Sequence, residues 1–264
     1  FLAGGTDVVP MLRDDAIAPD VVIDIKRIPG LGVLSVDGDT LHIGALVTFT
    51  DIIESEIITE HAPLLAEMAE TVASPGVRNR ATLVGNICSA VPSCDAGSVL
   101  IALDATVHLA GPSGERAVAI DDWFTGPRTT ARTDDEIVTH VSIGLRPHAG
   151  VYVKLMRYAG EDLAQAAVAI VADHKPSYRV AFGALAPTPI RSPRIEALLH
   201  GRSIDDDAVN EAVAMVSGEI SPITDIRSTA EYRRHMTEVM LERGLRAAAS
   251  RLAGDGPAYG TRLI

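Results

Sequence analysis

The chain has 264 residues, of which 47% are hydrophobic and 22% are charged, and its formal net charge is −12. The length and the apolar content indicate a globular protein with a large buried core and two domains. The excess of acidic residues argues against a nucleic-acid-binding surface, because neutralising phosphates requires clustered Lys and Arg. No apolar run approaches the length of a membrane span and no signal peptide opens the chain, so the sequence predicts a cytoplasmic protein.

The chain opens on Phe1-Leu2-Ala3-Gly4-Gly5-Thr6-Asp7, a pattern typical of a strand that turns directly into a helix. Thr6 or Asp7 can cap a helix over residues 8–12, and Pro10 is tolerated in its first turn. Glycines leave backbone N–H groups accessible, which favours a phosphate at the helix start. Two glycines are also common in ordinary tight turns, so the motif alone leaves both interpretations open. Because Phe1 begins within the expected strand, we expect that residues before it are missing from this sequence.

The region that follows mixes short strands and helices, which predicts an α+β domain. The expected strands are 21–25, 33–36, 41–45, 106–110, 116–120 and 136–145, and the expected helices are 52–57, 61–73, 95–104 and 121–124. Thr48 or Thr50 is expected to cap the helix at 52–57. Residues 74–93 interrupt this pattern with prolines and glycines that indicate turns.

The second part of the chain has a different order of elements. Residues 146–150 look like a domain joint, and the three expected strands beyond it are 151–158, 165–172 and 178–185. Their short connections favour antiparallel pairing. Only helices are expected after them, at 193–200, 205–216 and 229–253. The sequence therefore predicts one domain over 1–148 and a second over 149–264.

The segment with most chemical information is Val77-Arg78-Asn79-Arg80-Ala81-Thr82-Leu83-Val84-Gly85-Asn86-Ile87, followed by Pro92-Ser93-Cys94-Asp95. Together with the opening loop it resembles the FAD-binding (medium) subunit of molybdenum hydroxylases, the group of xanthine dehydrogenase and carbon monoxide dehydrogenase. In that family an A-G-G-T-D-like loop and a loop of the type R-N-x-x-T-x-G-G-N grip the FAD pyrophosphate, and a P-x-S-D or P-x-x-D segment follows. Arg78 and Arg80 could reach a phosphate, although solvated arginines are the simpler interpretation.

The resemblance extends over essentially the whole chain. Further family-like segments are 41–45, 121–126, 135–138, 154–164, 182–191 and 225–234. It implies an α+β fold, with a two-part FAD-binding domain of the PCMH (vanillyl-alcohol-oxidase-like) type. A C-terminal domain with a three-stranded antiparallel sheet and helices is expected to follow.

The resemblance also implies a set of cofactor-binding residues, and no catalytic or metal-binding residue. The cofactor-binding set is Leu2, Ala3, Gly4, Gly5, Thr6, Asp7, Thr82, Leu83, Val84, Gly85, Asn86, Asp95, Ile137, Val138, Lys154 and Asp162. Val84 stands where the second loop usually has its first glycine. Backbone N–H groups at Gly85 and Asn86 would then remain for a phosphate.

The resemblance gives several of these residues a specific place. Asp95 falls near the FAD ribityl or ribose, residues 137–138 would contact the flavin ring system, and Lys154, Glu161 and Asp162 would lie near the isoalloxazine. A cation there would stabilise the negative charge of the reduced ring.

Each of these side chains also has an ordinary structural interpretation. Lys154 could be a surface residue with a buried stem, and Asp162 could pair with Arg157. Asn86 could cap a turn, and Asp95 could cap the helix that follows it.

Cysteines and histidines are interpreted as structural. Cys88 and Cys94 are too few for a disulfide framework or a zinc or iron–sulfur site. The histidines have no metal-ligand spacing, and His42, His108 and His140 fall at strand positions, where a structural role is favoured over covalent attachment of a flavin.

The resemblance implies an oxidoreductase subunit that transfers electrons. A large subunit with a molybdenum–pterin cofactor would hydroxylate the substrate, and an iron–sulfur small subunit with two [2Fe–2S] clusters would relay electrons. FAD on this chain would pass them to an external acceptor, within a dimer of heterotrimers. Two alternatives stay open: a self-contained FAD-dependent oxidase or dehydrogenase, and a FAD-free scaffold subunit.

Overall fold

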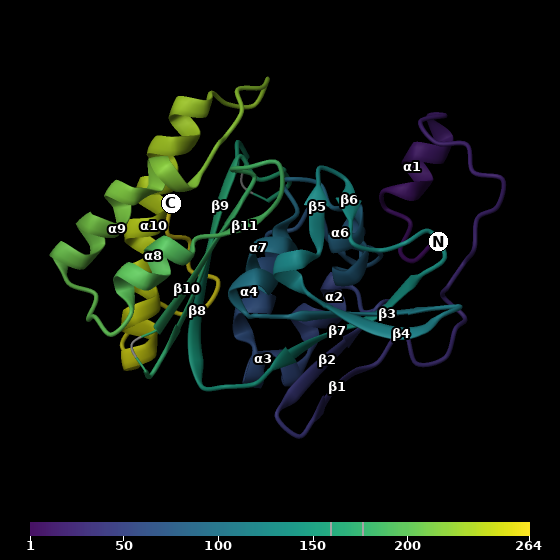
Figure 1. Ribbon diagram of the computed structural model, residues 1–264, viewed down its shortest axis with the longest axis horizontal. Helices are drawn as coiled ribbons and strands as arrows, with labels where there is room; N and C mark the ends of the chain where they lie inside the picture. The colour runs from purple at the N-terminus through teal and green to yellow at the C-terminus, as the bar shows by residue number, and fades with distance from the viewer. Residues whose placement is uncertain (159, 176) are drawn as a thin grey trace.

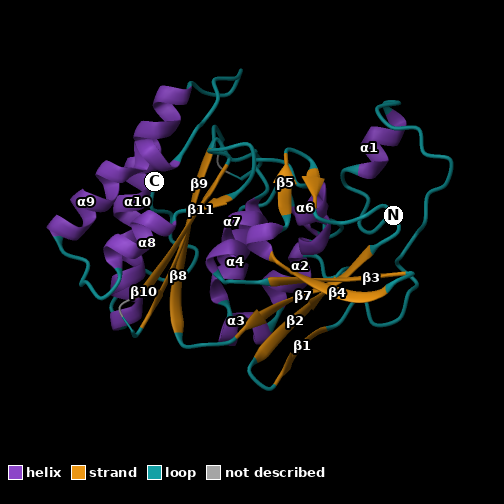
Figure 2. Cartoon of the chain, in the orientation of Figure 1, coloured by secondary structure: helices purple, strands orange, loops and turns teal. Residues whose placement is uncertain are grey.

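The structure is a computed structural model that describes residues 1–158, 160–175 and 177–264, and two antiparallel sheets organise it (Figure 1). One layer of helices lies between the two sheets, and a second layer covers the outer side of the C-terminal sheet (Figure 2). The predicted α+β architecture is therefore confirmed.

The N-terminal sheet has the strand order β1-β2-β7-β3-β4, and all of its pairs are antiparallel. Its strands are β1 (Leu34–Asp37), β2 (Thr40–Gly44), β3 (Thr106–Gly111), β4 (Gly114–Ala119) and β7 (Ile137–Gly144). On β2 and β3, apolar residues face the core and alternate with histidines on the outer face. The two expected hairpins, β1–β2 and β3–β4, are confirmed.

Short helices cover the inner face of this sheet. They are α2 (Phe49–Glu54), α3 (Glu56–His61), α4 (Pro63–Glu70), α5 (Pro75–Arg78), α6 (Leu83–Ser89) and α7 (Asp95–Ala102), with a 3₁₀ turn at Ile120–Asp122 and a small hairpin of β5 (Phe124–Gly126) and β6 (Thr129–Thr130). The first helix, α1 (Val8–Arg13), lies apart from this layer and buries none of its residues (Figure 1). Thr48 begins α2 with a capping box that involves Asp51, as one of the two expected caps.

The C-terminal sheet has the order β11-β10-β9-β8. It contains the three expected strands, β8 (His148–Leu155), β9 (Ala166–Asp173) and β10 (Ser177–Gly183), and a two-residue fourth strand, β11 (Ile190–Arg191). Three helices cover one face: α8 (Pro193–Leu199), α9 (Asp206–Glu219) and α10 (Ala230–Ala253), while α4 and α7 of the N-terminal unit cover the other. β9 is buried along almost its whole length because both of its faces are covered.

Several expectations differ from the structure. The helix expected at 52–57 is divided into α2 and α3 at Ser55, and β11 is a strand in the part where only helices were expected. The strand expected at 21–25 is wrong, since in the residues described there only an isolated bridge between Leu2 and Asp24 occurs. A β-rich run becomes a strand only where a partner strand is available, and Val21 is 71% exposed. The irregular segment expected at 74–93 contains α5 and α6, because Ser74 and Thr82 cap these short helices with their side chains.

Candidate functional site

A cavity of about 810 Å³ lies between the opening loop, α6, the start of β7 and the segment that follows β8. It is lined by every residue of the predicted cofactor set except Leu2, Leu83 and Lys154, and Glu161 lines it as well. Leu2 exchanges backbone hydrogen bonds with Ile23 and Ile25, and Leu83 is fully buried in the core. The tertiary fold therefore brings together four segments that are distant in the sequence.

The opening loop presents a run of backbone N–H groups to this cavity. Within the described part of the chain, the N–H groups of residues 4–8 have no hydrogen-bond partner. Gly5 has a φ of +82°, which favours glycine. At Gly4, a Cβ atom would lie 1.7 Å from the carbonyl oxygen of Arg80. The loop therefore rests directly on residues 77–87, called the second glycine segment below. Successive unpaired N–H groups of this kind form a concave anion-binding site.

The cap expected at the start of α1 is not present. Asp7 occupies the N-cap position, but its side chain makes no capping hydrogen bond. It instead accepts a hydrogen bond from the hydroxyl of Ser89, at the end of α6. This contact joins the opening loop to the end of α6.

In the second segment, most N–H groups are already used inside the protein. The N–H of Leu83 donates to Val47 O (3.2 Å), that of Gly85 to Thr82 Oγ1 (2.9 Å) and that of Asn86 to Thr82 O (3.0 Å). The expectation that the N–H groups of Gly85 and Asn86 remain available is therefore wrong. Among the described residues of this segment, the N–H of Val84 at the start of α6 has no partner.

Asn86 does not cap a turn of its own. Its Oδ1 accepts hydrogen bonds from the N–H of Ala96 (3.1 Å) and the thiol of Cys94 (3.1 Å). Asn86 therefore fixes the start of α7, and with it the position of Asp95.

Asp95 lines the cavity and connects the two units. Its Oδ1 accepts a hydrogen bond from the hydroxyl of Tyr152 (2.6 Å), and its Oδ2 accepts one from Nζ of Lys154 (3.0 Å). Nζ of Lys154 also donates to the carbonyl of Thr71 (2.9 Å). Burial, together with the Asp95 carboxylate, raises the pKa of Tyr152 well above its ordinary value. Two side chains of β8 thus hold the carboxylate of Asp95, and this carboxylate does not cap α7.

Lys154 is neither the free cation beside the cavity nor the surface residue that the sequence suggested. Its side chain is 2% exposed and forms an ion pair with Asp95. Asp162, in contrast, lines the cavity, and its carboxylate pairs with Nε of Arg157 at 3.0 Å as expected, while its place near the isoalloxazine stays a prediction. The hydrogen bond from Arg157 lowers the pKa of Asp162.

Several lining residues were not found by sequence reasoning. Apolar walls come from residues such as Phe49, Val72 and Leu163, and positive charge comes from Arg128 and Arg132. Phe49 and Val72 have the helical spacing of ordinary core residues, so no local signal separates them from the core. Arg128 lies in the turn of the β5–β6 hairpin and Arg132 follows β6, and neither belongs to a recognisable motif.

The cysteine side chains are not suited to reaction. Burial raises the pKa of Cys88 to about 12 and also raises that of Cys94. Both thiols are therefore protonated at neutral pH, in keeping with the structural role expected from the sequence.

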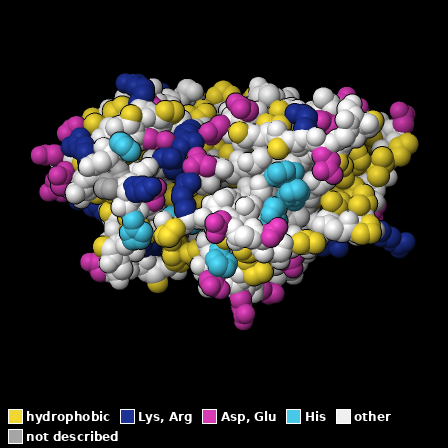
Figure 3. All heavy atoms as spheres, turned by 60° about the horizontal axis from the view of Figure 1, so that its bottom comes forward, with side chains coloured by type: hydrophobic (Ala, Val, Ile, Leu, Met, Phe, Trp, Pro, Cys, Tyr) yellow, Lys and Arg dark blue, Asp and Glu magenta, His cyan; other side chains and the backbone are white. Residues whose placement is uncertain are grey.

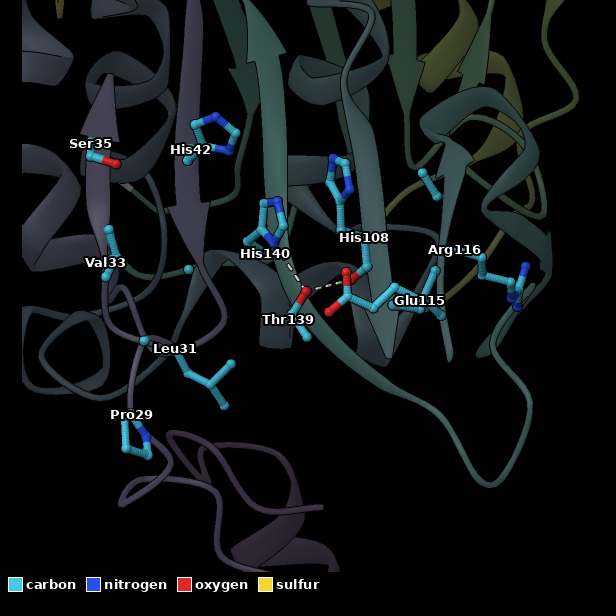
Figure 4. Close-up of a pocket in the computed structure, with 14 residues that line it drawn as sticks. Pro29, Leu31, Val33, Ser35, His42, His108, Glu115, Arg116, Thr139 and His140 are labelled. Atoms are coloured by element: carbon cyan, nitrogen blue, oxygen red, sulfur yellow. Dashed lines mark hydrogen bonds between the residues drawn. The ribbon is translucent and has the colours of Figure 1, made fainter. Parts of the chain in front are cut away.

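A second groove, of about 680 Å³, lies on the outer face of the N-terminal sheet. Histidine side chains gather on the face of the molecule that Figure 3 shows. His42, His108 and His140 come from the neighbouring strands β2, β3 and β7, and the rings of His108 and His140 stack with centroids 4.1 Å apart (Figure 4). Across the described ranges, no three His, Cys, Asp or Glu side chains are placed to hold a metal ion.

None of the helices in the described residues is both long and apolar enough to span a bilayer. The cytoplasmic location expected from the sequence stays a prediction.

Comparisons with known proteins identify the family of the chain. Residues 1–145 match the family described as "FAD binding domain in molybdopterin dehydrogenase", and residues 151–248 match the "CO dehydrogenase flavoprotein C-terminal domain". The chain is 34% identical to the glyceraldehyde dehydrogenase medium chain of Sulfolobus acidocaldarius, over 94% of this chain and 90% of that protein. It is 30% identical to the xanthine dehydrogenase FAD-binding subunit of Escherichia coli O157:H7, over 96% of this chain and 90% of that protein.

A solved structure of carbon monoxide dehydrogenase from Hydrogenophaga pseudoflava superposes on this chain with a TM-score of 0.91 at 35% identity, covering 95% of this chain and 89% of that chain. The sequence relatives and the fold point to the same group of proteins. The chain thus belongs to the FAD-binding medium subunits of the molybdenum hydroxylase family, to which xanthine dehydrogenase and carbon monoxide dehydrogenase belong.

Proposed function

We propose that this chain holds FAD in the 810 Å³ cavity and serves as the electron-transfer subunit of a molybdenum hydroxylase complex. When bound, FAD supplies the ability to accept electrons singly and to release them in pairs. The expected partners are an iron–sulfur small subunit with two [2Fe–2S] clusters and a large subunit with a molybdenum–pterin cofactor, in a dimer of heterotrimers. An external acceptor receives the electrons.

The observation that supports this proposal most is the run of unpartnered N–H groups over residues 4–8, beside that of Val84, in a cavity large enough for a dinucleotide. These donors suit the diphosphate of FAD because backbone N–H groups bind phosphate without a positively charged side chain. Since the available donor at Val84 is a backbone group, the side chain in place of the family glycine does not remove it.

Other residues have roles that follow from their placement. Both oxygens of Asp95 hold one donor each and keep capacity to accept a hydrogen bond from a ribityl or ribose hydroxyl. Ile137 and Val138 offer an apolar wall for the flavin ring, while Asp162 lies at the rim beside Arg157. We place the division between the two domains at residues 148 and 149.

A self-contained oxidase is less well supported. It would need an acid, base or nucleophile in the cavity, whereas Asp95 and Asp162 are ion-paired, Asp7 is bound by Ser89 and the thiol of Cys88 is protonated. Among the described lining residues, this leaves the carboxylate of Glu161 as the one candidate base. A FAD-free scaffold would not need the open N–H groups of the first loop.

Reconstitution of the complex tests the proposal. The purified chain should bind FAD with flavin absorbance and oxidise no organic substrate alone. Its FAD should be reduced by substrate only after the iron–sulfur and molybdenum chains are added. A Gly4→Ala variant should assemble with them but lose FAD, because its Cβ would collide with Arg80 O and displace the loop. Substrate oxidation by the chain alone would favour the oxidase, and absence of FAD binding would favour the scaffold.

A further inference from the structure

The cavity contains two basic side chains that neither the glycine motifs nor the family resemblance indicated. Among the lining residues that the structure describes, Arg128 and Arg132 are the only Lys or Arg. Of the basic residues that the sequence suggested, Arg78 donates to two backbone carbonyl groups, Lys154 pairs with Asp95, and Arg80 is not among the lining residues. Any side-chain positive charge inside this cavity therefore comes from these two arginines.

Arg132 is anchored by one edge of its guanidinium group. Its Nη1 donates to the carbonyl of Thr133 (2.7 Å) and to that of Glu136 (3.1 Å). Its Nε and Nη2 donate to no group within residues 1–158, 160–175 and 177–264. Arg128 is exposed, and its side chain makes no such contact in the same ranges. Arg132 is thus the pre-oriented cation of the two, with one edge of its fork available.

The loop that carries Arg132 is fixed from its other side. Arg116 binds the carboxylate of Glu136 and donates to the carbonyl of Ala131 (2.8 Å), and the N–H of Thr133 donates to Glu136 Oε2 (2.8 Å). The hydrogen bond from Arg116 lowers the pKa of Glu136 to about 2, so this carboxylate stays charged. Arg116 itself lies outside the cofactor cavity, in the histidine groove. The loop can therefore hold Arg132 in place before any ligand binds.

The surroundings of Arg132 place it near the glycine loops. The N–H of Arg128 donates to the carbonyl of Ala90 just after α6 (2.8 Å), and β6 and β7, the strands on either side of Arg132, both contact α6, whose residue Cys88 lines the same cavity. The next residue, Ser89, binds the side chain of Asp7 in the opening loop. Arg132 consequently lies on the part of the cavity wall where the end of α6 meets the loop with the unpartnered N–H groups.

We propose that Arg132 recognises the diphosphate of the bound dinucleotide, through the free edge of its guanidinium group. This inference rests on the proposed function and adds to the glycine loops a side chain that carries a full positive charge. A guanidinium fork matches phosphate oxygens, and charge-assisted hydrogen bonds are roughly twice as strong as neutral ones. In a chain with a net charge of −12, a local cation also offsets repulsion of the ligand's two negative charges.

Binding measurements on the full chain test this role. Dissociation constants are measured for FAD by its fluorescence change, and for ADP and riboflavin by competition with FAD. Arg132→Leu should weaken the binding of FAD and of ADP by about tenfold to a hundredfold, since a charge-assisted hydrogen bond is lost. Riboflavin has no phosphate, and its affinity should not change. The salt dependence of FAD binding should also decrease, because fewer charges then interact.

Three matched variants separate recognition from folding. Arg132→Lys keeps the charge without the fork and should give an intermediate affinity for ADP. Arg116→Leu loosens the same loop from outside the cavity, and Arg128→Leu removes the exposed cation. Each of these two variants should reduce the affinity for ADP less than Arg132→Leu does. If the affinity for riboflavin falls as much as that for FAD, or if Arg128→Leu has the larger effect, Arg132 does not recognise the diphosphate. Failure of the unmodified chain to bind FAD would instead remove the proposed function, and this inference with it.

Discussion

At the scale of single residues, the pair of Asp95 and Lys154 shows how the fold changes the meaning of a family position. The family position of Lys154 suggests a cation beside the flavin, but its ammonium group is buried against a carboxylate and a backbone carbonyl. A buried ion pair adds little net stability, yet breaking it by removing one partner is costly, because a charge is left buried and unpaired. Lys154 therefore positions Asp95 and does not present a free charge to the cavity.

We predict that Lys154→Met lowers the free energy of unfolding by about 3–5 kcal/mol, the usual effect of breaking a buried ion pair. Urea denaturation of the cofactor-free chain measures this value. The control is Lys26→Met, which removes an exposed pair with Asp24 and a hydrogen bond to the carbonyl of Ala3, and its effect on the free energy of unfolding should be much smaller. Adding Asp95→Asn to Lys154→Met should recover part of the loss. A Lys154→Met protein as stable as the Lys26→Met protein would contradict the pairing.

The opening loop could be predicted from the sequence because its property is local. A glycine at Gly5 permits the positive φ that turns the chain, whatever lies around it. In the second loop, the N–H groups of Gly85 and Asn86 are used by Thr82, which is a local cap, whereas the use of the Leu83 N–H by Val47 depends on the tertiary fold and could not be predicted. The anchoring of Arg132 was missed because its carbonyl partners, although close in the sequence, follow no motif.

At the scale of elements, strand register explains the histidine groove. His108 and His140 are direct partners across β3 and β7, and His42 on β2 lies beside His140, with ring centroids 5.4 Å apart. The strands themselves were predictable from alternation and turn residues. Their pairing was not, because β7 inserts between β2 and β3, which are far from it in the sequence. Strand pairing therefore brings these histidines together, and their spacing in the sequence does not reveal it.

This cluster predicts a loss of stability in mild acid. Burial lowers the pKa of His108 and His140, the neighbouring imidazoles lower it further, and Glu115 opposes the shift. A folded-state pKa below the ordinary value of about 6.5 means that protons bind the unfolded chain more tightly. The cluster's contribution to stability is thus present above that value and lost as the pH falls through the folded-state pKa values.

Chemical denaturation between about pH 8 and about pH 5 measures the effect. The double variant His108→Gln and His140→Gln should lose less stability over this range than the unmodified chain. Comparing slopes cancels other groups, such as His148, whose pKa is also lowered by burial. Equal slopes for the two proteins would show that the stacked histidines titrate normally.

At the scale of the whole molecule, a buried charge network joins the two units next to the cofactor cavity. Glu67 on α4 accepts hydrogen bonds from Nη2 of Arg251 on α10 (2.7 Å) and from the N–H of Tyr152 on β8 (2.7 Å). Arg251 also donates to the carbonyl of Gly150 (2.6 Å). The side chain of Tyr152 holds Asp95, so the same strand carries the unit junction and supports a residue that lines the cavity.

We expect Glu67→Gln to uncouple the two units. The substitution keeps the shape of the side chain but leaves Arg251 buried without a charged partner, at a cost of about 3–5 kcal/mol. Trp123 is the only tryptophan and is buried in the N-terminal unit, so its fluorescence reports that unit, whereas far-UV circular dichroism reports helices of both. The two signals should change together in the unmodified chain and separately in Glu67→Gln, the usual sign that two-state unfolding is lost.

FAD affinity should fall in the same variant, since a displaced β8 no longer orients Asp95 through Tyr152. Glu242→Gln, which removes an exposed partner of Arg246, is the matched control and should change neither the unfolding signals nor the FAD affinity. If Glu67→Gln unfolds in one transition at the midpoint of the unmodified chain, then the apolar contacts of α4 and α7 with the C-terminal sheet suffice to join the units. A split transition with reduced FAD binding would show that the junction and the cofactor cavity are held by one charge network.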